Sequence, residues 1–201
     1  MSEINTVCVY CGSGPGADPD FVIAARELGR LLAENRIGLV YGGGSIGLMG
    51  ALANSVLDHG GHVTGIIPEF LTLRERAFTR APEIVVTGDM HERKRQMFER
   101  ADAFVALPGG IGTLEELVEM MTWAQLGRHK KPILIANVKG FWDPLCALLE
   151  HMRAMDFIRP GLTVTPLVTN RVEDILPKLR EAAREVSEPE KEMQTADVER
   201  M

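Results

Sequence analysis

Ala103-Phe-Val-Ala-Leu-Pro-Gly-Gly-Ile-Gly-Thr-Leu-Glu-Glu-Leu-Val-Glu-Met-Met121 lies near the middle of this 201-residue chain. Its apolar start predicts a strand at about 102–107, and a glycine-rich loop follows at 108–113. Apolar residues then recur at helical spacing, at Leu114, Leu117, Val118 and Met121. A continuously apolar strand that leads through a short loop into a helix is typical of α/β proteins, in which helices cover both faces of a parallel sheet.

Strands and helices are predicted to alternate in the same way along the rest of the chain. Apolar runs predict strands at about residues 4–10, 37–41, 62–67, 83–87, 102–107, 132–136 and 164–169. We therefore expect a Rossmann-like, doubly wound parallel sheet of about seven strands. The single domain is expected to span residues 1–186, and residues 187–201 to form a polar, flexible tail.

Composition limits the classes of partner. The formal net charge of −6 gives no attraction to nucleic acid or to an anionic membrane. No run reaches the ~18–20 apolar residues that a membrane span needs, and the first residues do not resemble a signal peptide. Three cysteines, Cys8, Cys11 and Cys146, fit a reducing compartment, so we expect a cytoplasmic location.

The Cys8-x-x-Cys11 pair could indicate a redox or zinc site. Cys8 lies in a predicted strand, where side chains alternate between the two faces, so two residues three apart point in opposite directions. No second cysteine pair or nearby histidine completes a metal site. The sequence therefore favours two thiols packed around a core strand, and we expect neither a metal nor a cofactor.

Four informative segments fall at the carboxyl ends of predicted strands, which is where such sheets bind ligands. They are residues 11–16, 42–47, 89–94 and 108–116. Glycines in three of these segments let the backbone approach an anion, and helix N-termini offer unpaired N–H groups. Tight turns alone would explain one glycine-rich loop, but three on one edge favour a phosphate-binding site.

Gly42-x-Gly44-x-x-Gly47 also matches the dinucleotide-binding fingerprint, with Glu69 near the end of the next predicted strand. This spacing keeps an NAD-dependent oxidoreductase open as an alternative. In that arrangement one loop holds the pyrophosphate, and nothing requires the further glycine-rich loop at 108–113.

Glu116 has two interpretations. Thr113-x-x-Glu116 matches a helix capping box, in which the glutamate only satisfies backbone donors, and Asp89-x-x-Glu92 has the same pattern. The alternative is that Glu116 carries chemistry. The chain contains no zinc-binding histidine pair and no Gly-x-Ser-x-Gly nucleophile motif, so acid–base chemistry falls to carboxylates.

Arg93 and Lys94 lie within or beside the apolar stripe of their predicted helix. A cation that faces inward needs a partner, because an isolated buried charge costs several kcal/mol. Snorkelling or a structural salt bridge is one explanation. The other is a ligand phosphate or a carboxylate within the site.

Several of these segments resemble one known family. Pro108-Gly-Gly-Ile-Gly-Thr-Leu-Glu-Glu116 resembles the PGGxGTxxE signature of the Lonely Guy family, and Met90-His-Glu-Arg-Lys94 resembles that family's second motif. The Val9-Tyr-Cys-Gly-Ser13, Tyr41-Gly-Gly-Gly44 and Thr122-Trp-Ala-Gln-Leu-Gly127 segments are similar too. The resemblance covers about residues 4–170. Members are cytokinin-activating phosphoribohydrolases, many of which were long labelled lysine decarboxylases.

The resemblance implies release of a free base and ribose 5-phosphate from a nucleoside 5′-monophosphate. Adenine and an N6-prenylated adenine both remain open as the base. Arg93 and Glu116 occupy the catalytic positions. Substrate-binding positions are expected at Ser13, Gly43, Gly44, Ser45, Glu75, Lys94, Gly109, Gly110, Gly112 and Thr113. The family also implies a homodimer or a larger assembly of dimers, and a carrier of molybdenum cofactor is an alternative because related folds include such proteins.

Overall fold

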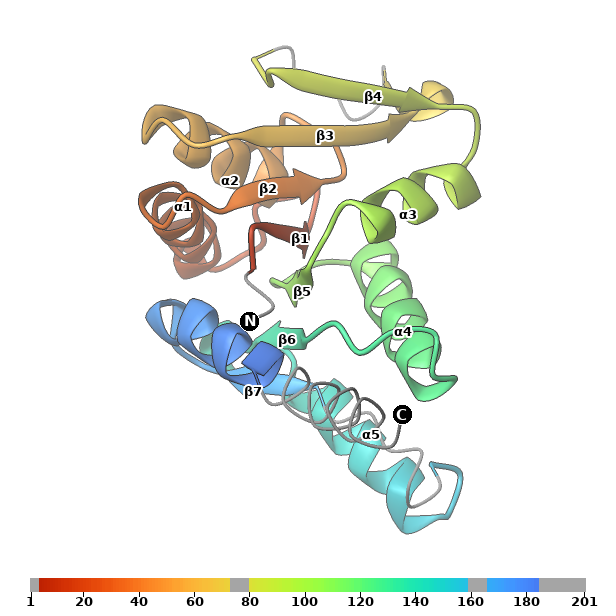
Figure 1. The fold of residues 1–201 in the computed structure, drawn as a ribbon. Helices are drawn as coiled ribbons and strands as arrows, with labels where there is room; N and C mark the ends of the chain where they lie inside the picture. Colours follow the sequence, from red (N-terminus) through yellow and green to blue (C-terminus); the bar gives the residue numbers. More distant parts are fainter. Residues whose placement is uncertain (1–3, 73–79, 159–165, 185–201) are drawn as a thin grey trace, which may run out of the picture.

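A computed structural model describes residues 4–72, 80–158 and 166–184, which share one seven-stranded sheet (Figure 1). The strands are β1 (Thr6–Tyr10), β2 (Gly38–Tyr41), β3 (Val63–Pro68), β4 (Glu83–Thr87), β5 (Ala103–Ala106), β6 (Ile133–Ala136) and β7 (Leu167–Thr169). Their order is β4-β3-β2-β1-β5-β6-β7, and every neighbouring pair is parallel. This confirms the predicted Rossmann-like sheet of seven strands.

Helices cover both faces of the sheet. The helices are α1 (Pro19–Glu34), α2 (Gly47–Asp58), α3 (Met90–Glu99), α4 (Ile111–Gln125) and α5 (Asp143–Ala154), with a further helical segment at residues 175–184. Short 3₁₀ turns lie at η1 (Glu69–Leu71), η2 (Val138–Gly140) and η3 (Val172–Asp174). Figure 1 shows α1, α2 and the 175–184 helix on one side of the sheet, and α3 and α4 on the other. Within the described ranges, no helix is long and apolar enough to cross a membrane.

Side-chain alternation along β1 divides the core into two layers. Val7 and Val9 pack with α1 and α2, whereas Cys8 and Tyr10 pack with α3, α4 and α5. Cys11 belongs to the first layer, so the two cysteines lie in different layers, as predicted. Neither forms a disulfide, and the described part of the chain holds no group of three or more side chains that could bind a metal ion.

The strand order places a switch point between β1 and β5. From β1 the chain adds β2, β3 and β4 on one side, then crosses back to place β5 on the other side of β1. The loops that leave β1 and β5 therefore diverge around a crevice, which is where open α/β sheets bind ligands. A hydrogen bond of 3.1 Å from the Gly12 amide to the Pro108 carbonyl joins these two loops.

The first turn of α2 is also tied to the loop after β1. The amides of Leu48 and Met49 donate to the Gly12 carbonyl at 3.1 and 3.4 Å, and the Leu48 amide also lies 3.3 Å from the Gly14 carbonyl. Gly47 has a φ of +59°, and a Cβ there would lie 2.2 Å from the Ser13 carbonyl oxygen. Glycine at position 47 thus permits both the left-handed backbone and the close approach of the two loops.

The Gly47→Ala substitution should destabilise the protein more than Gly127→Ala. Both glycines have positive φ, but a Cβ at Gly127 would have no neighbour within 4 Å. Left-handed strain costs about 1–2 kcal/mol, and overpacking adds about 1–3 kcal/mol at Gly47 only. Urea unfolding of the two variants measures the difference. Equal losses of unfolding free energy would contradict the close contact between the loops.

Candidate active site

A cavity of about 300 Å³ opens at the switch point, where β1, α3 and α4 converge. The loop after β1 contributes Gly12 and Ser13, and α3 contributes Met90 and Arg93. The start of α4 contributes Gly110, Ile111, Gly112, Thr113, Glu115 and Glu116. The cavity thus combines backbone from two loops with charged side chains from two helices.

Arg93 and Glu116 form a buried ion pair in this cavity. Their residues are only 6% and 8% exposed, and Nη2 of Arg93 lies 3.6 Å from Oε1 of Glu116. Nη2 also lies 3.5 Å from the carbonyl oxygen of Gly42, whereas Nε is buried without a hydrogen-bond partner in the described structure. The buried cation that the sequence predicted therefore faces a carboxylate within the site, and its hydrogen-bonding capacity is not exhausted.

Glu116 is not a capping residue. Helix α4 begins at Ile111 with Gly110 as its N-cap, so Thr113 already lies inside the helix and Glu116 lies in its second turn. The capping-box interpretation of Thr113 and Glu116 is therefore wrong. In α3 that interpretation is confirmed, because Asp89 accepts the Glu92 amide at 2.8 Å while Glu92 accepts the neighbouring Gly88 amide at 2.9 Å.

The N-terminus of α4 forms one wall of the cavity and has no side-chain cap. The amides of a first helical turn have no partner within the helix, and the helix dipole adds positive potential there. A Cβ at Gly110 or Gly112 would meet nothing within 4 Å, so this end of the helix is sterically open. Such an end can bind an anion such as a phosphate group.

Lys94 lies next to the cavity but does not line it. Its Nζ is 2.6 Å from Oε1 of Glu115 and 3.0 Å from Oε1 of Glu119, and its side chain is only 10% exposed. Burial lowers the pKa of the Lys94 ammonium, but the hydrogen bonds to Glu115 and Glu119 outweigh burial and raise the pKa above its ordinary value. Lys94 is therefore a permanent cation that holds two carboxylates of α4.

The structure brings together only part of the predicted site. Six of the predicted residues line the cavity: Ser13, Arg93, Gly110, Gly112, Thr113 and Glu116. Gly109 packs behind it, where a Cβ would lie 2.2 Å from Oγ1 of Thr113. Gly43, Gly44 and Ser45 do not line this cavity. Glu75 lies outside the described residues.

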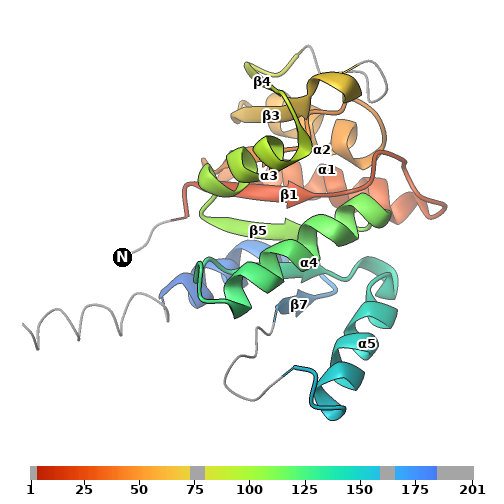
Figure 2. The same cartoon turned by 90° about the vertical axis from the view of Figure 1, so that its right-hand side faces the viewer.

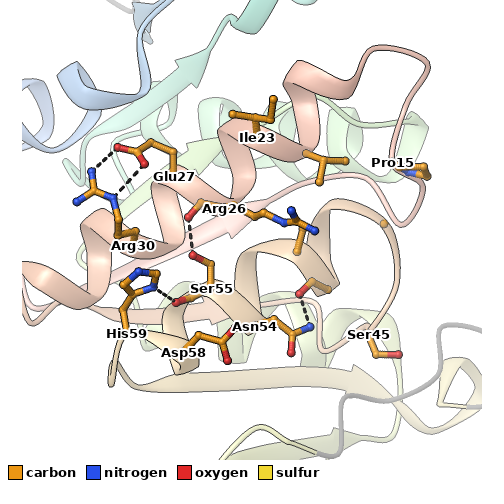
Figure 3. Close-up of a pocket in the computed structure, with 14 residues that line it drawn as sticks. Pro15, Ile23, Arg26, Glu27, Arg30, Ser45, Asn54, Ser55, Asp58 and His59 are labelled. Atoms are coloured by element: carbon orange, nitrogen blue, oxygen red, sulfur yellow. Dashed lines mark hydrogen bonds and ion pairs between the residues drawn. The ribbon is translucent and has the colours of Figure 1, made fainter.

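The segment from Gly43 to Ser45 contacts β2 and β3 and a second cavity, and does not line the cavity that contains Arg93 and Glu116. A Cβ at Gly43 would lie 3.0 Å from Cβ of Ile67, so this glycine packs against β3. The carbonyl of Gly44 accepts the Tyr41 hydroxyl at 3.2 Å. Ser45 lies at the edge of a second cavity, of about 780 Å³, between α1 and α2 (Figure 3).

This second cavity is larger, but its polar groups are largely paired with one another. Figure 3 shows Arg30 joined to Glu27, and the Ser55 hydroxyl bonded to the Arg26 carbonyl. Its Asp58 pairs with Arg80 at 2.9 Å. It has no buried ion pair comparable to Arg93 and Glu116 among the described residues, so we assign the chemistry to the smaller cavity.

Sequence reasoning missed two contributors, Gly42 and Tyr10. A Cβ at Gly42 would lie 2.3 Å from Nη2 of Arg93, so only glycine leaves room for the guanidinium. Tyr10 lines the cavity, and burial raises its pKa, reinforced by nearby Cys8 and Glu116. Burial, with the Glu116 charge, also raises the pKa of Cys8, so both groups stay neutral and Cys8 is no thiolate nucleophile.

The amino-acid sequence is similar to a family model and to several known proteins. A family model described as "Possible lysine decarboxylase" matches residues 49–179. The cytokinin riboside 5′-monophosphate phosphoribohydrolase LOG7 of Arabidopsis thaliana is 44% identical over 191 residues, which cover 95% of this chain and 85% of that protein. The corresponding LOG enzyme of Oryza sativa subsp. japonica is 51% identical over 157 residues, covering 78% of this chain and 65% of its own.

Solved structures with the same fold are more distant in sequence. The molybdenum cofactor binding protein from Rippkaea orientalis superimposes with a TM-score of 0.68 at 21% identity, covering 90% of this chain and 98% of that one. The fold and these matches together place the chain among Rossmann-like α/β proteins. The chain belongs to the Lonely Guy family, as the segments at 90–94 and 108–116 indicated.

Proposed function

We propose that this protein hydrolyses the N-glycosidic bond of a nucleoside 5′-monophosphate to give a free base and ribose 5-phosphate. The observation that carries the proposal is the buried Arg93–Glu116 pair, about one and a half helical turns from the uncapped start of α4. The amides of the helix end bind the 5′-phosphate. The sugar then lies along α4 beside the Glu116 carboxylate.

Glu116 acts on the reacting carbon. Cleavage of the bond between C1′ and the base develops positive charge on the ribose ring, which a neighbouring carboxylate stabilises. The attacking water forms the new C–O bond to C1′ and gives its proton to Glu116. The electron pair of the broken C–N bond leaves with the base, which takes up a proton from solvent, and Glu116 releases the proton that it accepted, so that the free base is neutral and the carboxylate is restored.

Arg93 is too basic to donate a proton at neutral pH. Its role is to orient Glu116 and to stabilise the negative charge that develops on the departing base. Its buried Nε, which has no partner in the described structure, can donate to a bound substrate. Binding would then satisfy a donor that is otherwise buried at a cost of about 1–3 kcal/mol.

The relatives support AMP or an N6-modified AMP as substrate, because LOG7 and the rice LOG enzyme are named as cytokinin riboside 5′-monophosphate phosphoribohydrolases. Carriage of molybdenum cofactor has weaker support, since that likeness is at 21% identity and concerns the fold. A dinucleotide-dependent reaction has less support still, because the first-turn amides of α2 are bonded to Gly12 and Gly14. The cysteines form no disulfide, which supports a cytoplasmic location.

We also propose that the protein is a homodimer that associates through α4 and α5. Both helices lie on the face shown in Figure 2. Their exposed apolar side chains include Val118, Leu148 and Met152, with Leu126 and Met155 directly after the helices at 77% and 54% exposure. Exposed apolar area of this kind marks protein–protein interfaces.

Glu116→Gln should lower turnover of AMP by roughly 10²–10⁴-fold, because the amide neither accepts a proton nor offers charge to C1′. The fold should persist, since Gly110 and not Glu116 caps α4 and glutamine still offers Arg93 an amide oxygen, but the melting temperature should fall because the buried cation loses its charged partner. Glu92→Gln is the matched control, because that glutamate caps α3 outside the cavity. Release of adenine is measured by chromatography, beside the melting temperature. Full activity in the Glu116→Gln variant would refute the mechanism.

AMP should be cleaved far better than adenosine. Each hydrogen bond to a phosphate contributes about 1.5–3 kcal/mol, so losing two or three lowers kcat/KM by at least ~10²–10³-fold. The assay compares the two compounds at equal concentration and detects free adenine. Equal cleavage would mean that the start of α4 does not bind a phosphate.

Leu126→Asp should convert a dimer into a monomer, because it places a charge within the proposed apolar interface. Ile23→Asp is the control, since Ile23 is 60% exposed but lies on α1, on the opposite side of the sheet. Light scattering gives the mass of each variant. A wild-type mass near the 22.1 kDa of one chain would contradict the dimer.

A further inference from the structure

We propose that His129 is a positioning residue that holds α3 against α4 and so fixes the separation of Arg93 and Glu116, an inference that rests on the function proposed above. Arg93 lies on α3, whereas Glu116 lies on α4. The 3.6 Å between Nη2 of Arg93 and Oε1 of Glu116 therefore depends on how one helix packs against the other. His129 itself lies outside the cavity, in the loop between α4 and β6.

Two sets of contacts join α3 to α4. Close to the cavity, Lys94 of α3 binds Glu115 and Glu119 of α4. One helical turn beyond Lys94, the ring of Phe98 packs edge-on against Trp123 of α4, with 5.0 Å between the ring centroids. Both helices begin at the carboxyl ends of parallel strands, so they run in the same direction and the aromatic contact lies further from the cavity. Contacts at two levels fix the relative position of two helices more fully than one contact does.

His129 extends the contact that lies further from the cavity. Its residue is only 9% exposed, and its ring packs edge-on against Phe98 of α3 and Phe104 of β5, with centroid distances of 5.3 and 5.7 Å. Its Nε2 lies 3.0 Å from the carbonyl oxygen of Met120 in α4. One buried side chain thus touches α3, α4 and the sheet.

The two ring nitrogens of His129 have different partners. A carbonyl oxygen only accepts, so Nε2 carries the proton, while Nδ1 accepts the Lys131 amide at 3.1 Å. Burial lowers the pKa of His129, and the charges of Lys131 and Arg128 act in the same direction, so the ring is neutral at neutral pH. Lys131 in turn donates from Nζ to the Phe98 carbonyl at 2.8 Å. The loop is therefore bonded to α4 through His129 and to α3 through Lys131.

The contacts of His129 lie close enough along both helices to act on the reacting pair. Met120 lies one turn after Glu116, on the same side of α4, and Phe98 lies five residues after Arg93 on α3. A displacement of α3 at Phe98 therefore also moves Arg93. Misplacing a group by about 1 Å can lower the rate about 10²-fold. The amides proposed to bind the phosphate belong to α4, so loss of His129 should lower kcat more than it changes KM.

The test compares two substitutions of His129 at a temperature well below melting. His129→Leu keeps apolar bulk but removes both hydrogen bonds, so kcat for AMP should fall about 10–100-fold while KM changes by less than about 3-fold. His129→Gln keeps an amide donor for the Met120 carbonyl and should restore kcat to within about 5-fold of wild type. His59→Leu is the matched control, because the His59 ring bonds the Ser55 carbonyl of α2 at 2.8 Å, on the other side of the sheet. Its kcat should equal that of wild type.

A second variant and a second measurement accompany the kinetics. Lys131→Met removes the bond to the Phe98 carbonyl and should lower kcat in the same way, which keeps the test decisive if His129→Leu does not fold. Hydrogen exchange followed by mass spectrometry should be faster in residues 90–99 of the His129 and Lys131 variants, and unchanged in α1.

Three results would overturn the proposal: an unchanged kcat in the folded His129→Leu and Lys131→Met proteins, a loss that appears in KM alone, or a His129→Gln protein as impaired as His129→Leu. Unchanged exchange in residues 90–99 would overturn it as well. If the wild-type protein releases no adenine, the proposed hydrolysis fails, and the exchange rates alone decide whether His129 holds α3 against α4.

Discussion

The backbone of Gly12 connects the three glycine-rich loops of this protein. Its amide donates to the Pro108 carbonyl before α4, and its carbonyl accepts the first-turn amides Leu48 and Met49 of α2. A Cβ at Gly12 would approach the Gly14 oxygen to 3.3 Å and the Gly109 Cα to 3.4 Å. The width of the crevice between β1 and β5 is therefore set by main-chain contacts.

These contacts give the two helix N-termini different roles. The start of α2 uses its amides to fix the loop after β1, so its dipole is already satisfied by carbonyl groups. The start of α4 has no side-chain cap and faces the cavity. One glycine-rich loop thus supports the architecture, and the other remains available to an anion.

Much of the fold, and part of the candidate site, could be predicted from the sequence, because these features follow from local sequence patterns. The apolar periodicity predicted all seven strands, and the position of Arg93 beside an apolar stripe predicted an inward-facing cation with a partner. The surroundings of Gly43–Ser45 could not be predicted, since they depend on the packing of Gly43 against Ile67 of the neighbouring strand β3, a contact between separate elements of the chain. The capping-box prediction for Thr113 and Glu116 was also wrong, because the N-cap of α4 is Gly110, about one turn before Thr113.

Because the crevice is held by main-chain groups, side chains at its mouth are free to vary without moving it. Ile111 is 82% exposed at the first position of α4 and lines the cavity, yet the helix start depends on none of its side-chain atoms. Relatives that share this framework can therefore exchange such residues at the mouth of the cavity without displacing the main-chain groups that shape it. Divergence of specificity and preservation of the reacting geometry are, in this architecture, separate problems.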